Sequence, residues 1–492
     1  MLRIVLVNPT YTAWDESIPL PKTLENTTPS FGLCCLAATL RDNGFDPKIV
    51  EAGALQLTSK QTLTYIIRER PNIVGFRAST VSFNNAAILA KEIKEYEKGI
   101  ITIIGGPHVT ALPTETIREF PQFDVGIVEE GEETLIELAK VINDKGIAAL
   151  NEIGHIRGLV FRHNGKVMLS AKRGYIKNLD SLPMPAWDLL EGFPEHYQPP
   201  LMSYKKLPVA SMVTSRGCPF QCIFCDRSVF GNLYRCYSAD YIVGMIEHLV
   251  TTYGIRHIIF YDDLFTASSS RLKAICNKII DKRIDITWSC DARINSVSPE
   301  SLALMKKAGC WEIAYGIESG SQEILDLLAK GIKLEEIERD VRLTHKAGIK
   351  IKGLFMMGHP LETIQTIKET LALAKRLPFN IINISKFTPF PGTDIYKDIH
   401  KYGHFNPDWK RMNANTFVFI PKGFTEKELE WEYRKAIAGY YWRPQKILSL
   451  LVALLRDPSG IKRLLRACYD ISIFFIFKGI SRLKRQEEVS RS

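Results

Sequence analysis

Short apolar segments alternate with amphipathic stretches along most of the chain. In the first 145 residues, amphipathic stretches separate five apolar runs, at 3–9, 47–52, 72–79, 100–106 and 123–131. Buried strands that alternate with helices are typical of a parallel sheet covered on both faces. Five such strands predict an α/β domain of the doubly wound, flavodoxin-like kind, whose ligand site lies beyond the carboxyl ends of the strands.

A second series of apolar runs follows residue 206. Its six members cover 209–215, 257–263, 286–293, 312–319, 351–358 and 381–388, and amphipathic segments fill the gaps between them. Six consecutive βα units predict an open, partial (β/α)6 barrel. Such a barrel carries its chemistry at the carboxyl ends of its strands.

The segments between and after these two series have different patterns. Hydrophobic alternation flanks Asn164-Gly165, which predicts a β-hairpin, and five prolines then follow within 180–200. Beyond about residue 400 the pattern is largely helical. We therefore divide the chain into a doubly wound domain (1–145), a hairpin and proline-rich connector (146–205), a partial barrel (206–400) and a helical C-terminal region with a basic tail (401–492).

The charge of the chain gives no support for a nucleic-acid substrate. The 492 residues carry a formal net charge of +10. Residues 443–492 hold eleven Lys/Arg against four Asp/Glu, a net of +7, which leaves +3 for the rest. A nucleic-acid-binding enzyme would be expected to carry its basic surface on the catalytic body.

The tail is a candidate for contact with a membrane surface. Its apolar runs at 447–455 and 471–477 are shorter than the roughly twenty residues that cross a bilayer. Basic residues lie among them, as in amphipathic helices that rest on an anionic surface. A helical cap packed on the barrel is the alternative. The N-terminal residues show no secretory pattern, so we expect a cytoplasmic protein, with peripheral contact at the inner membrane as an extension.

Three of the ten cysteines cluster directly after the first barrel strand. Cys218, Cys222 and Cys225 have the spacing Cys-x3-Cys-x2-Cys. A four-iron cluster usually takes four thiolates, so three would leave one iron open for a small bidentate molecule. The alternative is a zinc site with His257 or Cys236 as the fourth ligand, although zinc sites favour paired motifs and no second pair occurs here.

This loop and the motifs around it resemble the radical S-adenosylmethionine superfamily. The matching motifs in the barrel are YDDLF (261–265), WSCDARIN (288–295), GIESG (316–320), GLFMMGHPLET (353–363) and TPFPGT (388–393). The first domain, with GGPHVTALPTET (105–116) and VEEGEETL (128–135), is similar to the cobalamin-binding domain of one branch. That branch includes the anaerobic magnesium-protoporphyrin ester cyclase and hopanoid methylases.

The resemblance implies a 4Fe–4S cluster on the three cysteines, with S-adenosylmethionine on its open iron. It implies S-adenosylmethionine contacts from Phe224, Asp263, Arg293, Glu318 and Ser319. A carboxylate suits the ammonium group and a guanidinium suits the carboxylate of this molecule. Core packing for the aromatic residue and a surface salt bridge for the arginine are the alternatives.

The resemblance also implies a cobalamin site in the first domain. The Asp-x-His-x-x-Gly loop that ligates cobalt from below is absent, which implies binding without a histidine ligand. The residues expected near the nucleotide tail are Gly105, Gly106, Pro107, His108, Glu130, Gly131 and Glu132. Glycines let the backbone approach a ligand closely. An ordinary strand–turn–helix with acidic residues at the helix start is the alternative.

The implied activity is methylation of an unactivated carbon in a small-molecule or lipid-like substrate. A 5′-deoxyadenosyl radical would remove hydrogen, methylcobalamin would deliver the methyl group, and flavodoxin or ferredoxin would supply electrons. Oxidative cyclisation or rearrangement with the same cofactors is the alternative. A tRNA methylthiotransferase carries three N-terminal cysteines, whereas the first domain has only adjacent Cys34 and Cys35 in an apolar helix pattern. A zinc-binding nucleic-acid module is the remaining class.

Overall fold

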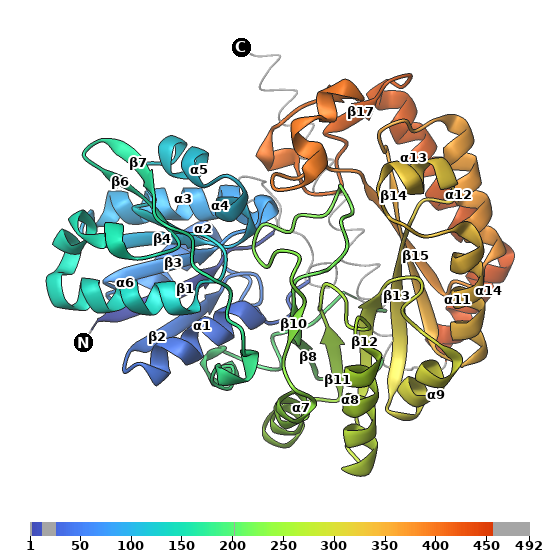
Figure 1. Ribbon diagram of the computed structural model, residues 1–492, viewed down its shortest axis with the longest axis horizontal. Helices are drawn as coiled ribbons and strands as arrows, with labels where there is room; N and C mark the ends of the chain where they lie inside the picture. Colours follow the sequence, from blue (N-terminus) through green and yellow to red (C-terminus); the bar gives the residue numbers. More distant parts are fainter. Residues whose placement is uncertain (1, 12–25, 201, 456–492) are drawn as a thin grey trace.

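The computed structural model describes residues 2–11, 26–200 and 202–455, which form two parallel sheets lying side by side (Figure 1). The parallel strands of the first sheet are β1 (Arg3–Asn8), β2 (Asp46–Glu51), β3 (Ile73–Arg77), β4 (Ile101–Gly105) and β5 (Val125–Ile127). All five predicted strands are therefore confirmed. Their order is β2-β1-β3-β4-β5, so the chain changes direction across the sheet between β1 and β3. In such sheets the ligand crevice opens at this point.

A hairpin from the connector extends this sheet to seven strands. β6 (Leu159–His163) pairs antiparallel with β5, and β7 (Lys166–Leu169) pairs antiparallel with β6. Asn164 and Gly165 between them have φ angles of +49° and +75°. Both angles are positive, as a tight two-residue hairpin turn requires, and the predicted hairpin is confirmed.

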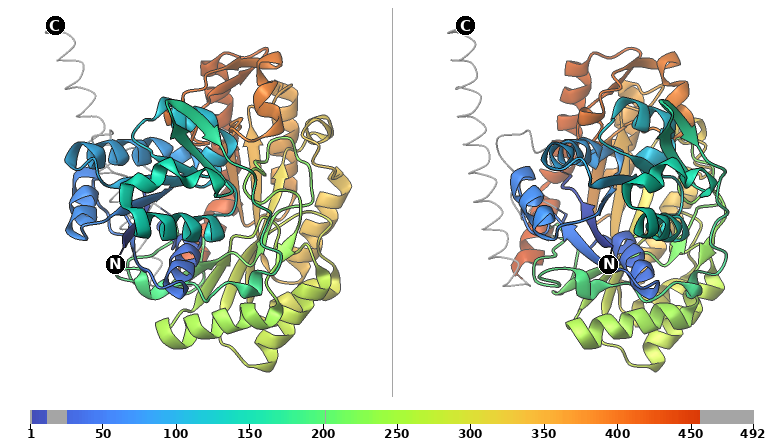
Figure 2. Two further views of the ribbon diagram at one scale, coloured as in Figure 1. Left: turned by 60° about the vertical axis from the view of Figure 1, so that its left-hand side comes forward. Right: turned by 90° about the vertical axis from the view of Figure 1, so that its left-hand side faces the viewer.

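Helices cover both faces of the first sheet (Figure 2). One face packs on α1 (Phe31–Asp42) and α6 (Glu132–Lys145), and the other on α2 (Ser59–Arg68), α3 (Thr80–Tyr96), α4 (Pro107–Ala111) and α5 (Pro113–Glu119). The core beneath α1 and α6 continues through the connector into the core of the second sheet. The two sheets thus share one apolar core.

The second sheet consists of six parallel strands in sequence order. They are β8 (Val209–Met212), β11 (His257–Phe260), β12 (Thr287–Ala292), β13 (Cys310–Glu318), β14 (Lys350–Met357) and β15 (Ile381–Lys386). The edge strands β8 and β15 do not pair with each other. The helices between these strands are α7 (Ala239–Tyr253), α8 (Ser269–Asp281), α9 (Pro299–Lys307), α10 (Gln322–Leu327), α11 (Leu334–Lys346) and α12 (Ile364–Arg376). All six predicted strands of this series are confirmed.

The C-terminal region is only partly helical, which corrects the prediction for 401–425. β16 (Gly403–Phe405) and β17 (Phe419–Pro421) form a small antiparallel pair over their own apolar cluster. These strands are three residues long, too short to show a period in the sequence. Two helices follow, α13 (Glu426–Tyr441) and α14 (Pro444–Leu455).

The apolar run 447–455 lies in α14, whereas the run 471–477 lies outside the described residues. Hydroxyls of Tyr440 and Tyr441 donate to the carbonyls of Phe379 and Ile382, which ties α13 to the start of β15. Within the described part of the chain, no helix is both long and apolar enough to cross a membrane.

A substitution at Trp187 tests whether the two sheets share one core. Its side chain is 1% exposed, and its ring centroid lies 6.2 Å from that of Phe31 in α1 and 6.0 Å from that of His248 in α7. Replacing Trp187 by Ala should remove about 3–5 kcal/mol of stability and lower the thermal unfolding midpoint by several degrees. The matched variant Trp431→Ala changes a side chain that is 63% exposed and should leave the midpoint nearly unchanged. Equal midpoints for both variants would contradict a shared core.

Candidate functional site

A cavity of 590 Å³ opens between the carboxyl ends of the strands of both sheets. The first sheet contributes the ends of β1, β3, β4 and β5, and the second contributes the cysteine loop and the ends of β12, β13 and β14. Carboxyl ends of parallel strands are where α/β folds place their ligands. The packing of the two sheets therefore makes one site from two strand edges.

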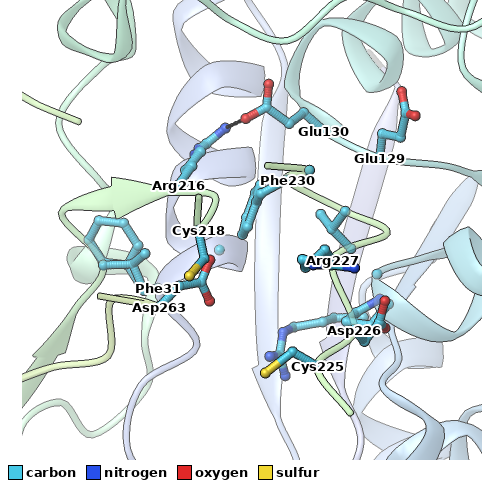
Figure 3. A pocket seen from close by; sticks show the side chains of 18 of the residues that line it. Phe31, Glu129, Glu130, Arg216, Cys218, Cys225, Asp226, Arg227, Phe230 and Asp263 are labelled. Carbon is cyan, nitrogen blue, oxygen red and sulfur yellow. Dashed lines mark hydrogen bonds and ion pairs between the residues drawn. The ribbon is translucent and has the colours of Figure 1, made fainter. Parts of the chain in front are cut away.

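The three cysteines of the loop all line this cavity. The loop runs between the two-residue strands β9 (Ser215–Arg216) and β10 (Arg235–Cys236), which pair antiparallel and close its base. Figure 3 shows Cys218 beside Asp263 and the Cys225 thiol farther along the same loop. The loop thus presents three soft thiol ligands to one space.

Two cations lie beside these thiols. Arg293 Nη1 is 3.7 Å from Cys222 Sγ, and its guanidinium stacks 3.7 Å from the ring centroid of Phe220. A hydrogen bond from Cys225, with the positive charges of Lys330 and Arg293, lowers the pKa of the Cys222 thiol to about 6 despite burial. Burial raises the pKa of Cys218 and the hydrogen bond to Cys222 raises the pKa of Cys225, so the thiolate, the form that binds metals, is favoured at Cys222 alone.

The arrangement does not resemble a mononuclear zinc site. Among the described residues, no three His, Cys, Asp or Glu side chains are grouped closely enough to hold one metal ion. A 4Fe–4S cluster binds each thiolate through a different iron, so its ligands need not converge on one point. His257 begins β11 and bonds to Thr287 at the start of β12 at 2.8 Å, at the amino ends of the strands and away from the loop.

Four of the five residues expected to contact S-adenosylmethionine line the cavity: Phe224, Asp263, Arg293 and Glu318. The neighbouring Asp262 is buried and accepts hydrogen bonds from Thr214 and Ser215, so of the two acids only Asp263 reaches the cavity.

Ser319 requires a correction. It is fully buried outside the cavity and its hydroxyl bonds to Thr370 of α12 at 3.1 Å. Ser319 follows the last residue of β13, and the positive φ of Glu318 ends the regular strand there, so the Ser319 side chain meets Thr370 instead of the cavity.

Glu318 forms a buried ion pair that the sequence did not reveal. Lys330 Nζ donates to Glu318 Oε1 at 2.8 Å and lies 5.6 Å from the ring centroid of Phe224. Burial alone would lower the pKa of Lys330, but Glu318 and the neighbouring thiols reverse the direction and raise it. Glu318 has a φ of +66°, a strained conformation for a non-glycine residue and a feature that often marks functional sites.

On the side of the first sheet, backbone rather than side chain forms much of the cavity wall. Gly105, Gly106, Pro107 and Gly131 all line it. Gly106 has a φ of +107°, and a Cβ there would lie 2.8 Å from the carbonyl oxygen of Ala78. Only glycine fits this turn, which keeps the edge of β4 open for a large ligand.

His108 requires a correction, because it belongs to the core. Its ring is fully buried and stacks on Phe83 at a centroid distance of 3.8 Å, and Nδ1 is 3.2 Å from Thr80 Oγ1. Burial lowers its pKa to about 3, so the ring is neutral. No histidine of the described residues lines the cavity.

Glu130 and Glu132 line the cavity, but their carboxylates are engaged by arginines of the cysteine loop. Arg216 donates to Glu130 at 2.7 Å and to Glu132 at 2.5 Å, and Arg235 donates to Glu130 at 2.9 Å. All four side chains are 4–7% exposed. Figure 3 shows the Arg216–Glu130 contact. These acids therefore join the two domains, and they are not free to contact a ligand through their charge.

The sequence offered a signal for part of this network. Arg216 lies in a buried strand next to the cysteine loop, and charged residues are almost never fully buried unless paired. Its partners come from residues 130 and 132, so the pairing itself could not be predicted from the chain. Lys330 follows a short helix and gives no comparable signal.

The fold and the cavity define a class of two-domain α/β proteins in which a glycine-lined sheet edge faces a three-cysteine loop. Family models match this division: a B12 binding domain over residues 20–139 and the radical SAM superfamily over residues 212–374. An uncharacterized methyltransferase of Pyrococcus horikoshii, PH0819, is 33% identical over 91% of this chain and 94% of its own length. The chain belongs to the family of cobalamin-binding radical S-adenosylmethionine enzymes.

Two further similarities agree with this family. The anaerobic magnesium-protoporphyrin IX monomethyl ester cyclase of Cereibacter sphaeroides is 27% identical over 96% of this chain and 77% of its own length. The solved structure of OxsB, a cobalamin-dependent radical enzyme with aqua-cobalamin and S-adenosylmethionine bound, has a TM-score of 0.72 and 17% identity, covering 94% of this chain and 72% of that one. The cofactors of this chain are accordingly cobalamin, a 4Fe–4S cluster and S-adenosylmethionine.

The Arg216 network yields a stability prediction. Replacing Arg216 by Ala leaves two buried carboxylates without their main partner and should cost about 3–5 kcal/mol. The matched variant Arg41→Ala breaks a two-bond pair with Asp188 whose side chains are 46% and 54% exposed, and should cost less than about 1 kcal/mol. Thermal unfolding of both variants measures the difference. An Arg216 variant as stable as the Arg41 variant would show that the network does not hold the domains together.

Proposed function

We propose that the protein is a cobalamin-dependent radical S-adenosylmethionine methyltransferase acting on an unactivated carbon. The observation that carries the proposal is the single cavity that receives both the three-cysteine loop and the glycine-lined edge of the first sheet. Chemistry that passes a group between two cofactors needs both within reach of one substrate. The relative that matches 94% of its own length is named a methyltransferase, which supports methyl transfer as the reaction.

The residues proposed to hold the cluster are Cys218, Cys222 and Cys225. Three thiols on one cavity wall, beside the cations of Arg293 and Lys330, fit an anionic iron–sulfur cluster with one open iron. When bound, the cluster supplies the electron that cleaves S-adenosylmethionine, and cobalamin supplies the methyl group. The protein orients these groups and excludes water from them.

The residues proposed to hold S-adenosylmethionine are Phe224, Asp263, Arg293 and Glu318. Asp263 offers acceptor oxygens for the ammonium group, and Arg293 offers donors for the carboxylate. Lys330 bonds to Glu318 and fixes its carboxylate at the cavity wall. Phe224 presents an aromatic face for adenine beside the last cysteine.

The residues proposed to approach cobalamin are Gly105, Gly106, Pro107 and Gly131. Their exposed backbone suits a large, flat ligand and its nucleotide tail. Since His108 is buried in the core, we propose that cobalt has no histidine ligand from the described part of the chain.

The finer classification of the two domains is also a proposal. The strand order β2-β1-β3-β4-β5 supports a flavodoxin-like first domain, and six sequential parallel strands with unpaired edges support a partial barrel. We keep the divisions 1–145, 146–205, 206–400 and 401–492, with the hairpin of the connector added to the first sheet.

Oxidative cyclisation is the second candidate function, and the cyclase from Cereibacter sphaeroides is the observation in its favour. The cyclase is less similar in sequence to this chain than the Pyrococcus horikoshii methyltransferase is, and a smaller share of its own length is matched. Methylthiotransferase activity gains no support from Cys34 and Cys35, which are buried side chains of α1.

We propose a small-molecule or lipid-like substrate and an electron donor such as flavodoxin or ferredoxin. We further propose a cytoplasmic protein whose C-terminal helix contacts the inner membrane peripherally. The apolar run 447–455, which follows Arg443 and Lys446 in sequence, supports this contact.

The reaction class is tested with methyl-labelled S-adenosylmethionine. Anaerobically purified protein, loaded with cobalamin and reduced, should release 5′-deoxyadenosine and transfer label to cobalamin and then to substrate. Label in the product separates methyl transfer from cyclisation. Absence of 5′-deoxyadenosine from protein with an intact cluster would refute the radical assignment.

The cluster ligands are tested by cysteine variants. Cys222→Ala should lose the bound iron and 5′-deoxyadenosine formation while still binding cobalamin, because the corrin site lies on the other sheet. Cys236→Ala removes an exposed thiol at the base of the same loop and should retain full iron content. Loss of iron in the Cys236 variant, with retention in the Cys222 variant, would overturn the assignment of ligands.

A further inference from the structure

A second cavity, of 580 Å³, lies at the opposite end of the second sheet from the first. It is formed by the C-terminal ends of α11 and α12 and the start of α14, near the amino ends of β14 and β15. Figure 1 shows these three helices together on the outer side of this sheet. The cavity shares no lining residue with the first one, so the proposed reaction does not use it.

The walls of this cavity are strongly basic. Six basic side chains line it: Arg342, His345, Lys375, Arg376, Arg443 and Lys446. No carboxylate of the described residues lines it. The acid nearest in contact is Glu338, which pairs with Arg342 at 2.8 Å and Arg376 at 3.2 Å. One carboxylate shared by two arginines leaves an excess of positive charge.

Arg443 and Lys446 are held in place without acidic partners. Arg443 donates to the carbonyls of Tyr440 at 2.9 Å and Lys375 at 3.1 Å, and Lys446 donates to the carbonyl of Phe379. Carbonyl dipoles hold these side chains in place but do not neutralise them. The positive charges around the cavity repel one another. An anion bound in the cavity therefore lowers their electrostatic free energy.

An apolar face borders the basic cavity on α14. Ile447 is 44% exposed, Leu448 is 62% exposed and Val452 is 36% exposed. Leu448 and Val452 are one helical turn apart, so their side chains lie on the same side of α14. Trp442, at the end of α13, is 79% exposed. Exposed tryptophan and aliphatic side chains next to cations are the composition of a membrane interface.

We propose that this α14 surface, made of the five Lys and Arg side chains of the cavity, Trp442, Ile447, Leu448 and Val452, docks on an anionic phospholipid bilayer. Lipid phosphate groups occupy the basic cavity, and the apolar side chains enter the headgroup region. A soluble phosphate compound would use the cavity alone and would leave the apolar face exposed to water. The inference rests on the proposed peripheral membrane contact and locates it on the folded barrel. Because the cavity lies at the amino ends of the strands, docking leaves the cysteine-lined cavity at the other end unobstructed.

The test is vesicle flotation of the full-length protein, under anaerobic conditions. Vesicles of phosphatidylcholine alone are compared with vesicles that also contain phosphatidylglycerol. We expect flotation only with the anionic vesicles at about 0.1 M salt, and loss of binding as salt shortens the Debye length from about 10 Å. Absence of binding to anionic vesicles would refute membrane contact as a whole, without touching the catalytic proposal.

Point variants locate the contact. Lys375→Gln combined with Leu448→Ser removes one cavity cation and one exposed apolar side chain, and should weaken vesicle binding roughly tenfold or more. The matched control, Lys91→Gln with Tyr96→Ser, changes an exposed cation and an exposed aromatic residue on α3 and should bind as the unchanged protein does. Lys375 has no hydrogen bond or ion pair from its side chain within the described residues, and Leu448 is exposed, so folding should be preserved.

The other outcomes each overturn the proposal. Undiminished binding of the Lys375–Leu448 variant would assign the contact elsewhere, for example to basic residues beyond 455. If Lys375→Gln alone weakens binding and Leu448→Ser has no effect, the cavity is a site for soluble anions. Competition by inorganic phosphate that abolishes flotation at constant ionic strength would likewise identify the cavity as a site for soluble anions.

Discussion

The buried ion network of Glu130, Glu132, Arg216 and Arg235 is the interaction on which the rest of the structure depends. None of these charges is stable alone in the interior, because desolvating a single ion is expensive unless it is paired. Glu130 in the loop after β5 and Glu132 at the start of α6 meet two arginines that flank the cysteine loop. The network therefore fixes the distance between the end of the first sheet and the loop that carries the thiols, and the cavity is the space left between them.

The chemistry of the cavity follows from what each sheet can supply. The first sheet ends in glycines, so its edge offers backbone and open space to a large cofactor. The second sheet ends in charged side chains and thiols, with Arg293 and Lys330 placed to favour anionic sulfur. In the proposed function, the first edge accommodates a flat ring, and the second holds and orients small charged groups near the reacting atoms.

The two ends of the second sheet differ because all of its strands run in the same direction. Carboxyl ends gather the loops that follow strands, and here those loops carry the cofactor-facing residues. Amino ends gather the C-termini of the covering helices, where cations such as Arg376 interact favourably with the helix dipole. At this end, α14 adds an exposed apolar face beside the basic side chains. This combination is the basis of the proposed docking on an anionic bilayer.

The sequence by itself determined the eleven parallel strands, the Asn164-Gly165 hairpin and the three-cysteine loop, because each is set by local periodicity or spacing. It also determined the family. The tertiary structure alone decided which candidate side chains share a space. Ser319 and His108 follow strand ends, yet one bonds to Thr370 and the other stacks on Phe83, since side-chain direction depends on packing partners distant in sequence. The pairing of Arg216 with Glu130 and Glu132 could likewise not be predicted from the sequence, because the partners of this buried charge belong to another domain.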